Sequence, residues 1–407
     1  MRIQRSSFKE LGIRGSVAQR MDTLILVGVV AAMVAFGLLM VFSSSFIYAQ
    51  ERMGDGFAFI ERQVFYAIAG GIALAVFSRV DYRRWGEWAF PLLVLSTVLL
   101  IIVAIPGLGT RVGGARRWIK AGFLSFQPAE LAKFAVIFFT AFQLFRKQGR
   151  LHTITAGVLS HFIVPLPALI LLLIQPDFGS IVIICAVVFS LLYLAGVPKR
   201  YLFASLFVAI MVGLWLVMGS AYRKGRMTAF LDPWGDPGGK GFQLLQSLVG
   251  LHEGGFLGVG LGNGKEKLFY LPEAHNDFIF AVIGEELGFL GVLAVVAAYL
   301  YFVYCGLRIS WRSIGLFGDS FGMLLGSGIT LSIGAQGLIN MAVVLGLVPT
   351  KGLTLPFISY GGSALVVDLA AVGVLLSIAR GPDCAEKQHE TEKIKPFKES
   401  NNVVASQ

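Results

Sequence analysis

The 407-residue sequence has few charged residues, which make up 14% of the chain, whereas 56% of its residues are hydrophobic. The apolar residues form long runs that lack both the spacing of half-buried helices and the alternation of barrel strands. Because backbone groups inside hydrocarbon must form hydrogen bonds within their own segment, helices are the spanning element that fits. The sequence therefore predicts an all-α polytopic membrane protein without a separate soluble domain.

Cysteine is scarce as well, and the spacing of Cys185, Cys305 and Cys384 matches neither a disulfide framework nor a metal site. We expect these cysteines to pack in or beside the spans. The first apolar run is not followed by a small-residue cleavage site. We therefore expect this run to remain as a membrane anchor instead of being removed as a signal peptide.

Ten apolar runs are each close to the ~20 residues that cross the core of a bilayer. They cover residues 22–48, 62–78, 87–105, 129–145, 157–175, 179–197, 201–218, 278–304, 320–346 and 362–379. An even number of spans places both termini on one side, and the short connections on that side are enriched in lysine and arginine, which indicates the cytoplasm. These short basic blocks account for the net charge of +10, so we expect no nucleic-acid partner.

Three segments lie outside the spans. Residues 1–20 are basic and cytoplasmic, and they belong with one membrane domain over residues 1–380. The connection 219–277, between the seventh and eighth spans, is long and external, and its Pro/Gly cluster and mixed apolar stretch predict short helices at the membrane interface. Residues 381–407 are charged and lack apolar periodicity, which predicts a disordered cytoplasmic tail.

The external connection near residues 107–122 carries positive charge that the topology does not require. Arg111, Arg116, Arg117 and Lys120 lie there among several glycines. Guanidinium groups match phosphate oxygens, and glycine lets backbone amides approach a ligand closely. The segment indicates binding of an anionic head group. The alternative is contact with ordinary anionic phospholipid, with Trp118 as an interfacial anchor.

Charged and polar residues also lie within the spans. Glu130 and Lys133 are three residues apart near the outer end of the fourth span, where they either serve function or form an ion pair that only neutralises itself. A polar stripe in the ninth span should face inward, and a carboxyl group in the tenth span needs a partner that the sequence does not identify. These residues are Ser332, Gln336, Asn340 and Asp368.

Asp277 lies at the outer end of the eighth span, where it could simply cap the helix. Counting on by three or four residues, the same helix face carries Glu285 among small residues, and such a face points into a bundle. A carboxylate at the outer mouth suits a general base that takes a proton from a hydroxyl. Glu273 and His275 are nearby candidates for tuning it. With Lys351 after the ninth span, these residues predict a substrate with a lipid tail, a phosphorylated linkage and a group to be deprotonated.

Five long motifs occur in an order that resembles the SEDS family, the membrane glycosyltransferases of bacterial shape, elongation, division and sporulation. They are "GARRWI" at 114–119, "QPAELAKF" at 127–134, "QPDFGS" at 175–180, "LPEAHNDFIFAVIGEELG" at 271–288 and "PTKGLTLPFISYGGS" at 349–363. "PEAHND" and "PTKGLTLPFISYGG" are more similar to the FtsW branch than to the RodA branch, where another residue usually precedes the histidine and the lysine is usually absent.

The resemblance implies polymerisation of lipid II, a disaccharide-pentapeptide on undecaprenyl pyrophosphate, at the outer face of the bacterial cytoplasmic membrane. By this match Asp277 would deprotonate the 4-hydroxyl of the acceptor sugar, which displaces the pyrophosphate with inversion. Arg117, Lys133 and Lys351 would hold the pyrophosphate. A divalent cation, Mg²⁺ or Mn²⁺, could share this task, although no ligand cluster has diagnostic spacing. The further substrate-binding candidates are Arg116, Trp118, Glu130, His275, Glu285 and Ser359.

The resemblance also implies a class B penicillin-binding protein as the transpeptidase partner, and other divisome proteins at the division septum. Two residues depart from the family pattern: Arg116, where a small residue is common, and Asp368, where asparagine is expected.

Two other functions stay open. A lipid II flippase would have much the same composition, but the chain lacks an inverted repeat and its best acid lies at the outer mouth instead of the midplane. A non-catalytic divisome scaffold would predict that Asp277→Asn has no effect.

Overall fold

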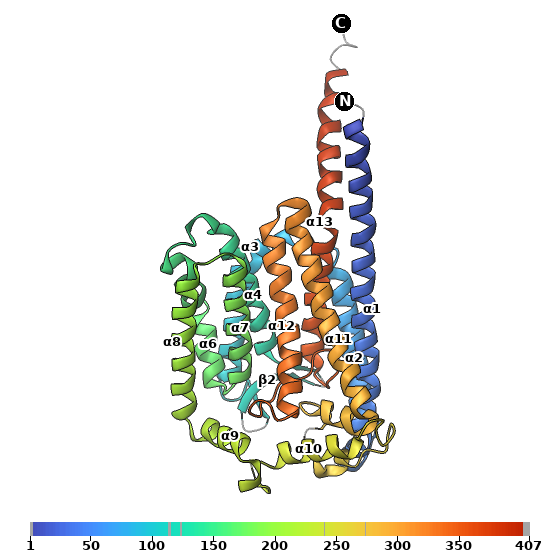
Figure 1. The fold of residues 1–407 in the computed structure, drawn as a ribbon, viewed down its shortest axis with the longest axis vertical. Coiled ribbons are helices and arrows are strands. Elements are labelled where there is room, and N and C mark those ends of the chain that lie inside the picture. The colour runs from blue at the N-terminus through green and yellow to red at the C-terminus, as the bar shows by residue number, and fades with distance from the viewer. Residues whose placement is uncertain (1–2, 113–114, 123, 240, 273, 402–407) are drawn as a thin grey trace.

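The long helices of the protein lie side by side in one bundle, with both chain ends at the same end of it (Figure 1). The structure is a computed structural model that describes residues 3–401 apart from 113–114, 123, 240 and 273. We call the end that holds the termini the inner end and the opposite end the outer end. The common side of the two termini agrees with the even number of spans predicted from the sequence.

The helices occupy all ten predicted spans. Eight of the described helices are long and apolar enough to cross a membrane, and a pair bent by 42° makes a ninth. The bend lies at Pro165, which has no backbone N–H to continue the helix. The tenth is α7, with 17 residues. In chain order the spanning helices are α1 (Ile3–Met53), α2 (Ala58–Phe77), α3 (Arg83–Ala104), α4 (Pro128–Arg146), the pair of Thr155–Ile163 and α6 (Leu166–Ile174), α7 (Phe178–Leu194), α8 (Lys199–Met218), α11 (Ile279–Phe317), α12 (Ser320–Val344) and α13 (Gly362–Asn401). The first half of the bent pair contains the π-helical turn η2 (Thr155–Leu159) and α5 (Ser160–Ile163).

Burial distinguishes central helices from peripheral ones. In α4, α12 and α13 the buried share of the apolar stretch is 78%, 78% and 83%, whereas in α8 it is 0%. Many of the polar residues within the spans lie on these central helices, since hydrocarbon would not solvate them. α8 can be apolar on nearly all sides because, apart from Leu202, its residues are not buried in the bundle.

Short helices and a small sheet cover the outer end. α9 (Ala221–Leu231) and α10 (Phe242–Gly254) lie across the ends of the long helices, which confirms the short helices predicted for the connection 219–277 (Figure 1). The turn η3 (Pro233–Gly235) joins them, and η4 (Glu266–Tyr270) precedes α11.

The cationic connection after α3 is not an irregular loop, because it folds into three antiparallel strands in the order β1-β2-β3. These are β1 (Thr110–Val112), β2 (Ala115–Ala121) and β3 (Leu124–Phe126). The all-α prediction did not include this sheet. Strand pairing within the segment satisfies backbone groups that would otherwise lie unpaired near the membrane.

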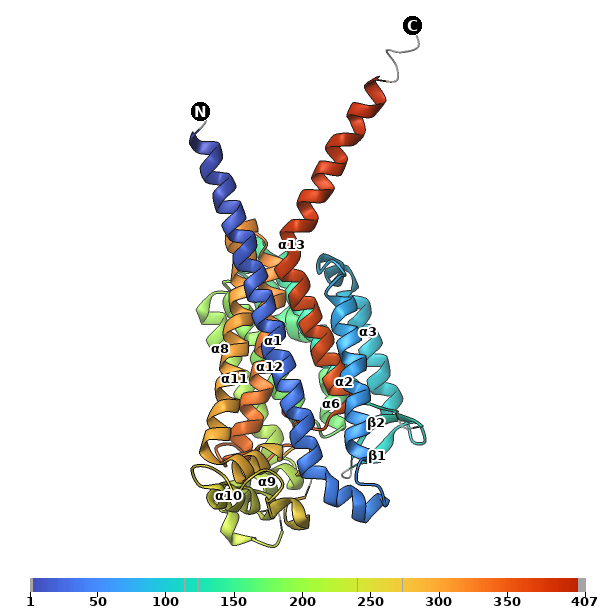
Figure 2. The same ribbon diagram turned by 90° about the vertical axis from the view of Figure 1, so that its right-hand side faces the viewer.

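The two ends of the chain extend beyond the bundle as helices that diverge from each other (Figure 2). α13 is helical to Asn401, where the sequence predicted a disordered tail from residue 381. Glutamate and lysine are frequent in this stretch and favour a helix. The division into a membrane domain of residues 1–380 and a tail stays a prediction.

α11 is interrupted at Gly288, whose φ of +65° and ψ of −162° are not helical. The glycine-rich segment 255–264 fills the interruption. Phe289 donates its N–H to Gly255 O instead of to Glu285 O, and Val259 donates to Glu285 O in return, at 2.9 and 3.0 Å. These two backbone groups freed by the break therefore have partners, as a site next to hydrocarbon requires.

Acidic side chains join this segment to α1 and α11. Glu286 accepts hydrogen bonds from Lys267, at 2.7 Å, and from Ser43 of α1. Glu285 accepts from the N–H groups of Lys265 and Glu266. Glu266 itself is 5% exposed, and its Oε2 has no hydrogen-bond partner in the part of the chain that the structure describes. Burial, together with nearby Glu285 and Glu253, raises the pKa of Glu266 to about 7.

Glu266→Gln should stabilise the protein at alkaline pH. Because the pKa of Glu266 is higher in the folded state than in the unfolded state, its protonation stabilises the folded state. This contribution is fully present at pH values below the ordinary pKa of glutamate, and it is lost as the pH rises through about 7. From about pH 5 to about pH 8 the wild type should lose about 2 kcal/mol relative to Glu266→Gln. Thermal unfolding of both proteins across this range measures the difference. Glu61→Gln, at an exposed position, is the control, and parallel pH profiles for wild type and Glu266→Gln would contradict the prediction.

Candidate functional site

A cavity of about 450 Å³, which we call the outer cavity, opens at the outer end of the bundle. It lies where helices end: β2 and the start of α4 form one wall, α9 and α10 another, and the segments before α7 and α11 and after α12 complete it. Its lining residues are Arg117, Trp118, Gln127, Pro176, Asp177, Phe178, Gly179, Val217, Arg223, Arg226, Met227, Gln243, Asn276, Asp277, Phe278, Pro349, Thr350, Lys351, Gly352 and Thr354.

Asp277 is fixed on the wall of the outer cavity by a hydrogen bond to its backbone carbonyl and by close packing against Gly352. Asn340 of α12 donates its side-chain N–H to Asp277 O at 2.8 Å and also to Leu353 O. The same amide therefore joins the start of α11 to the segment after α12. On that segment Gly352 lies so close that a Cβ built on it would come within 2.8 Å of Asp277 Oδ2. The carboxyl group thus lies beside backbone that carries no side chain, with Lys351 as the next residue.

Four cationic side chains line the same cavity. Lys351 and Arg223 both lie over the ring of Phe178, at 5.3 and 5.7 Å from its centroid. Arg226 donates to Thr350 O at 3.1 Å. Burial lowers the pKa of Lys351, and the nearby carboxylate of Asp177 offsets part of this effect. A cationic cavity of this kind favours a ligand with more than one negative charge.

Arg117 is the fourth cation, and it is held in place by the chain before α7. Its Nε donates to Gln175 O at 2.8 Å and its Nη2 to Pro176 O at 2.7 Å. Gln175 in turn donates its side-chain amide to Leu100 O of α3. Because two of the five guanidinium N–H groups are used in this way, the remaining ones are oriented for a ligand in the cavity.

Behind the outer cavity, Lys133 is fully buried among polar groups of three helices. Its ammonium donates to Glu130 at 2.7 Å and to Gln336 of α12, and it lies 4.0 Å from Asp368 of α13. Gln336 links Lys133 to the cavity wall, because its amide donates to the backbone carbonyl of Thr354, which lines the cavity. Lys133 is thus the ion-pair partner of Asp368 that the sequence did not identify, although neither carboxyl oxygen of Asp368 has a hydrogen-bond partner among the described residues.

The comparisons with known proteins agree with one another. The family model described as cell cycle protein, for FtsW, RodA and SpoVE, matches residues 23–383. The chain belongs to this family. The probable peptidoglycan glycosyltransferase FtsW of Trichlorobacter lovleyi is 44% identical over 88% of this chain and 93% of its own. The protein of the same name from Geobacter sulfurreducens is 44% identical over 91% of this chain and 98% of its own.

Two solved structures resemble the fold. One is a chain from a study of polymerisation and crosslinking by a peptidoglycan synthase complex, with a TM-score of 0.69, 29% identity, and coverage of 87% of this chain and 96% of that one. The other is the rod shape determining protein RodA of Thermus thermophilus, with a TM-score of 0.63 and 27% identity over 87% of this chain and 95% of that one.

Some of the site residues predicted for this FtsW/RodA/SpoVE family member meet in the outer cavity, and others do not. Arg117, Trp118, Asp277 and Lys351 line it. Glu130 and Lys133 lie behind it as the buried pair described above. Their roles in binding stay predictions.

Four other predicted residues lie apart from the cavity lining. His275 packs among the rings of Phe59, Tyr48 and Tyr360, with centroids 4.7 to 5.8 Å away. Ser359 accepts the N–H of Leu355 at 2.8 Å and so closes a buried turn. The remaining two are Glu285, which binds the segment before α11, and Arg116, which pairs with Arg111 in the sheet. Glu273 lies outside the described residues.

Several residues of the outer cavity were not predicted from the sequence. Asp177 lies in the quoted motif "QPDFGS", where it caps α7 by accepting from Ser180, and this motif alone was a signal for it. Arg223 and Arg226 lie in the long external connection, whereas only the cations of short connections served to predict the topology. Only the folding of α9 back over the outer end brings them to Asp277.

The part of the chain that the structure describes contains no group of three or more His, Cys, Asp or Glu side chains placed to hold a metal ion. Asp177 and Asp277 are the acids of the outer cavity, and Asp177 already accepts two hydrogen bonds from Ser180. The expectation of a divalent cation stays a prediction, and we assign no residue to it.

Arg117→Ala should weaken the binding of a lipid-linked diphosphate about tenfold or more, because it removes a charged donor from the outer cavity. Its neighbour Arg116 is the matched control, since Arg116 has the same charge but lies outside the cavity lining. Arg116→Ala should leave the affinity within about twofold. Titration of both variants and the wild type with the lipid measures the difference, and equal losses for the two variants would show that general surface charge attracts the ligand.

The lowered pKa of Lys351 gives a second test. Its ammonium loses the proton at a lower pH than an ordinary lysine, so diphosphate binding to the wild type should weaken early as the pH rises toward about 10. In Lys351→Arg the charge persists, because a guanidinium stays protonated throughout this range. The alkaline loss of affinity should therefore move to higher pH in the variant. Superimposable alkaline profiles would remove Lys351 from the binding site.

Proposed function

We propose that this protein is a peptidoglycan glycosyltransferase that polymerises lipid II at the outer face of the cytoplasmic membrane, with Asp277 as the general base. One observation carries the proposal: Asp277, fixed by Asn340 and beside Gly352, shares a cavity at the membrane mouth with four cations, whereas the other acid of the cavity, Asp177, caps α7. Such a cavity fits a substrate whose diphosphate lies at the interface while its polyprenyl tail stays in lipid. The FtsW proteins that resemble this chain have names that agree with this activity.

In the proposed reaction, Asp277 takes the proton from the 4-hydroxyl of the acceptor sugar. The hydroxyl oxygen forms a bond to the anomeric carbon of the donor, and the bond from that carbon to the diphosphate oxygen breaks. The electron pair leaves with the polyprenyl diphosphate, and the anomeric carbon is inverted. Arg117, Arg223 and Lys351 stabilise the negative charge that develops on the leaving group, in a cavity where water competes less than in bulk solvent.

Asp277 lies in surroundings that suit a base. It is partly buried, so a substrate can cover it, and four cations line the same cavity. Its backbone carbonyl, not its carboxyl group, is the acceptor for Asn340, so the hydrogen bond from Asn340 fixes this position without using the carboxyl group.

We also propose a transpeptidase partner of the class B penicillin-binding protein type, within the divisome at the septum. Support comes from the resemblance to a chain of a peptidoglycan synthase complex that coordinates polymerisation and crosslinking, and from relatives named FtsW. If polymerisation requires the partner, the purified pair is the right material for every activity measurement.

Asp277→Asn should abolish polymerisation, with a loss of at least about a hundredfold, because the amide keeps the shape but cannot accept the proton. The measurement is formation of glycan chains from lipid II by the purified protein with its transpeptidase partner, separated on a gel. The control is Asp55→Asn, at an exposed external acid outside the cavity lining, which should keep normal rates.

Equal product from Asp277→Asn and wild type would remove Asp277 from the chemistry. Absence of product from every protein, with folding and partner binding intact, would favour the flippase function and call for a transport assay in vesicles.

A further inference from the structure

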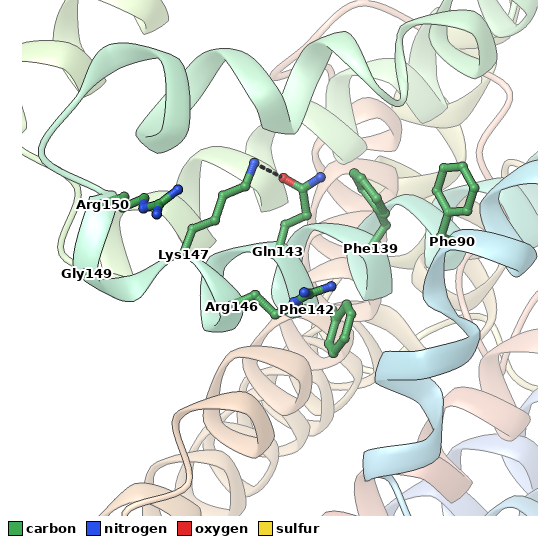
Figure 3. Close-up of a pocket in the computed structure, with 8 residues that line it drawn as sticks. All are labelled: Phe90, Phe139, Phe142, Gln143, Arg146, Lys147, Gly149 and Arg150. Atoms are coloured by element: carbon green, nitrogen blue, oxygen red, sulfur yellow. Dashed lines mark hydrogen bonds between the residues drawn. The ribbon is translucent and has the colours of Figure 1, made fainter.

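A second cavity, of about 660 Å³, lies at the inner end of the bundle, and we call it the inner cavity (Figure 3). α4 connects the two sites, because Gln127, just before its first turn, lines the outer cavity, whereas Arg146 in its last turn lines the inner one. A spanning helix thus separates the inner cavity from the proposed chemistry.

Aromatic side chains form one part of the inner cavity. They are Phe90 of α3 and Phe139 and Phe142 of α4. Phe90 is 57% exposed and lies on a helix whose outward residues, among them Trp88 and Val94, are also exposed apolar side chains. In a membrane-spanning helix such a surface contacts lipid chains. This part of the cavity therefore continues into the hydrocarbon.

Cations form the other part. Arg146, Lys147 and Arg150 line the cavity at the point where α4 ends and the short turn η1 (Gln148–Arg150) follows. None of the three takes part in an ion pair within the described part of the chain. Lys147 donates to Gln143 Oε1 at 3.0 Å, and the Arg146 guanidinium lies 5.7 Å from the centroid of Phe142 (Figure 3).

Membrane topology and the helix dipole explain why cations occur after the inner end of a span. They do not explain why three cations and three phenylalanines line one cavity. A ligand that satisfies both parts needs a negatively charged group at the membrane interface and an apolar chain that runs outward along α3 and α4. A soluble phosphate would leave the aromatic part empty, and an acidic peptide would have to place backbone in hydrocarbon.

We propose that the inner cavity is a binding site for an anionic phospholipid of the inner leaflet. Arg146, Lys147 and Arg150 bind the phosphate, and an acyl chain packs against Phe139 and Phe90. Gln143 orients the Lys147 ammonium toward the phosphate. Because the lysine side chain is already held, binding costs less conformational entropy. The site is separate from the proposed polymerase chemistry, and neither depends on the other.

The test uses the purified full-length protein in a neutral detergent, with phosphatidylglycerol, phosphatidylcholine carrying the same chains, or inorganic phosphate as the added probe. Lipid retained per protein is counted by native mass spectrometry, and its affinity is taken from thermal unfolding. The variant is Arg146→Gln with Lys147→Gln. The matched control is Lys199→Gln with Arg200→Gln, an adjacent pair of the same composition that begins another span.

We expect the wild type to bind phosphatidylglycerol at least about fivefold more tightly than phosphatidylcholine, and the Arg146/Lys147 variant to lose about tenfold or more of this affinity. The Lys199/Arg200 control should bind as the wild type does. Phe90→Ala tests the chain contact at an exposed position where folding is not at stake, and it should weaken phosphatidylglycerol binding.

Three results would overturn the proposal. One is equal affinity for the two lipids. Another is an equal loss in the Arg146/Lys147 variant and the Lys199/Arg200 control, which would indicate general attraction by surface charge. The third is stabilisation by inorganic phosphate as strong as that by phosphatidylglycerol, which would indicate a site for free phosphate.

Discussion

The arrangement of the outer cavity depends on the contacts of the buried Lys133 ammonium. A charge within a membrane span is tolerated when it is paired and hydrogen-bonded. Here the partners come from three central helices: Glu130 on α4, Gln336 on α12 and Asp368 on α13. Each helix is thereby fixed in rotation about its axis. Loss of Lys133 would leave Glu130 and Asp368 buried without this cation, at a cost of roughly 3–5 kcal/mol.

This network reaches the proposed chemistry through the segment after α12. Gln336 holds Thr354, and one turn further along the same helix face Asn340 holds both Leu353 and Asp277. The polar residues Gln336 and Asn340, which join the spans to one another, thus also fix Asp277 and the segment that carries Lys351 on the wall of one cavity. Positions set by buried hydrogen bonds are the kind of preorganisation that stabilises developing charge.

Irregular backbone gathers at the outer end, where the site is built. The interruption of α11 at Gly288 is tolerated because segment 255–264 supplies the missing hydrogen bonds, and the short piece of α11 before it begins beside Asp277. In consequence the cavity is formed by ends of helices and the segments that join them, and its walls come from parts of the chain far apart in the sequence.

Much of the fold was predictable, because a span needs a long apolar run and the ten runs are visible directly. Asp277, Arg117 and Lys351 were also predictable, since charge at a membrane mouth is costly and calls for an explanation. The pairing of Lys133 with Asp368 was not predictable, because neither apolar run by itself determines how α4 and α13 are rotated about their axes. Glu285 illustrates another limit: it was correctly placed on an inward face, but its partners lie on a segment whose path depends on the break at Gly288. Arg223 and Arg226 were missed because only the fold of α9 over the outer end gives them a position.

The central claim is that the cations bind the substrate and Asp277 acts in the chemical step. The most direct measurement is the equilibrium affinity of the purified Asp277→Asn variant, in complex with its transpeptidase partner, for lipid II. The account predicts an affinity within about threefold of the wild type, since a general base contributes to the transition state more than to the bound substrate. A loss of affinity as large as the one expected on removal of the Arg117 guanidinium would contradict it and make Asp277 a binding or structural residue.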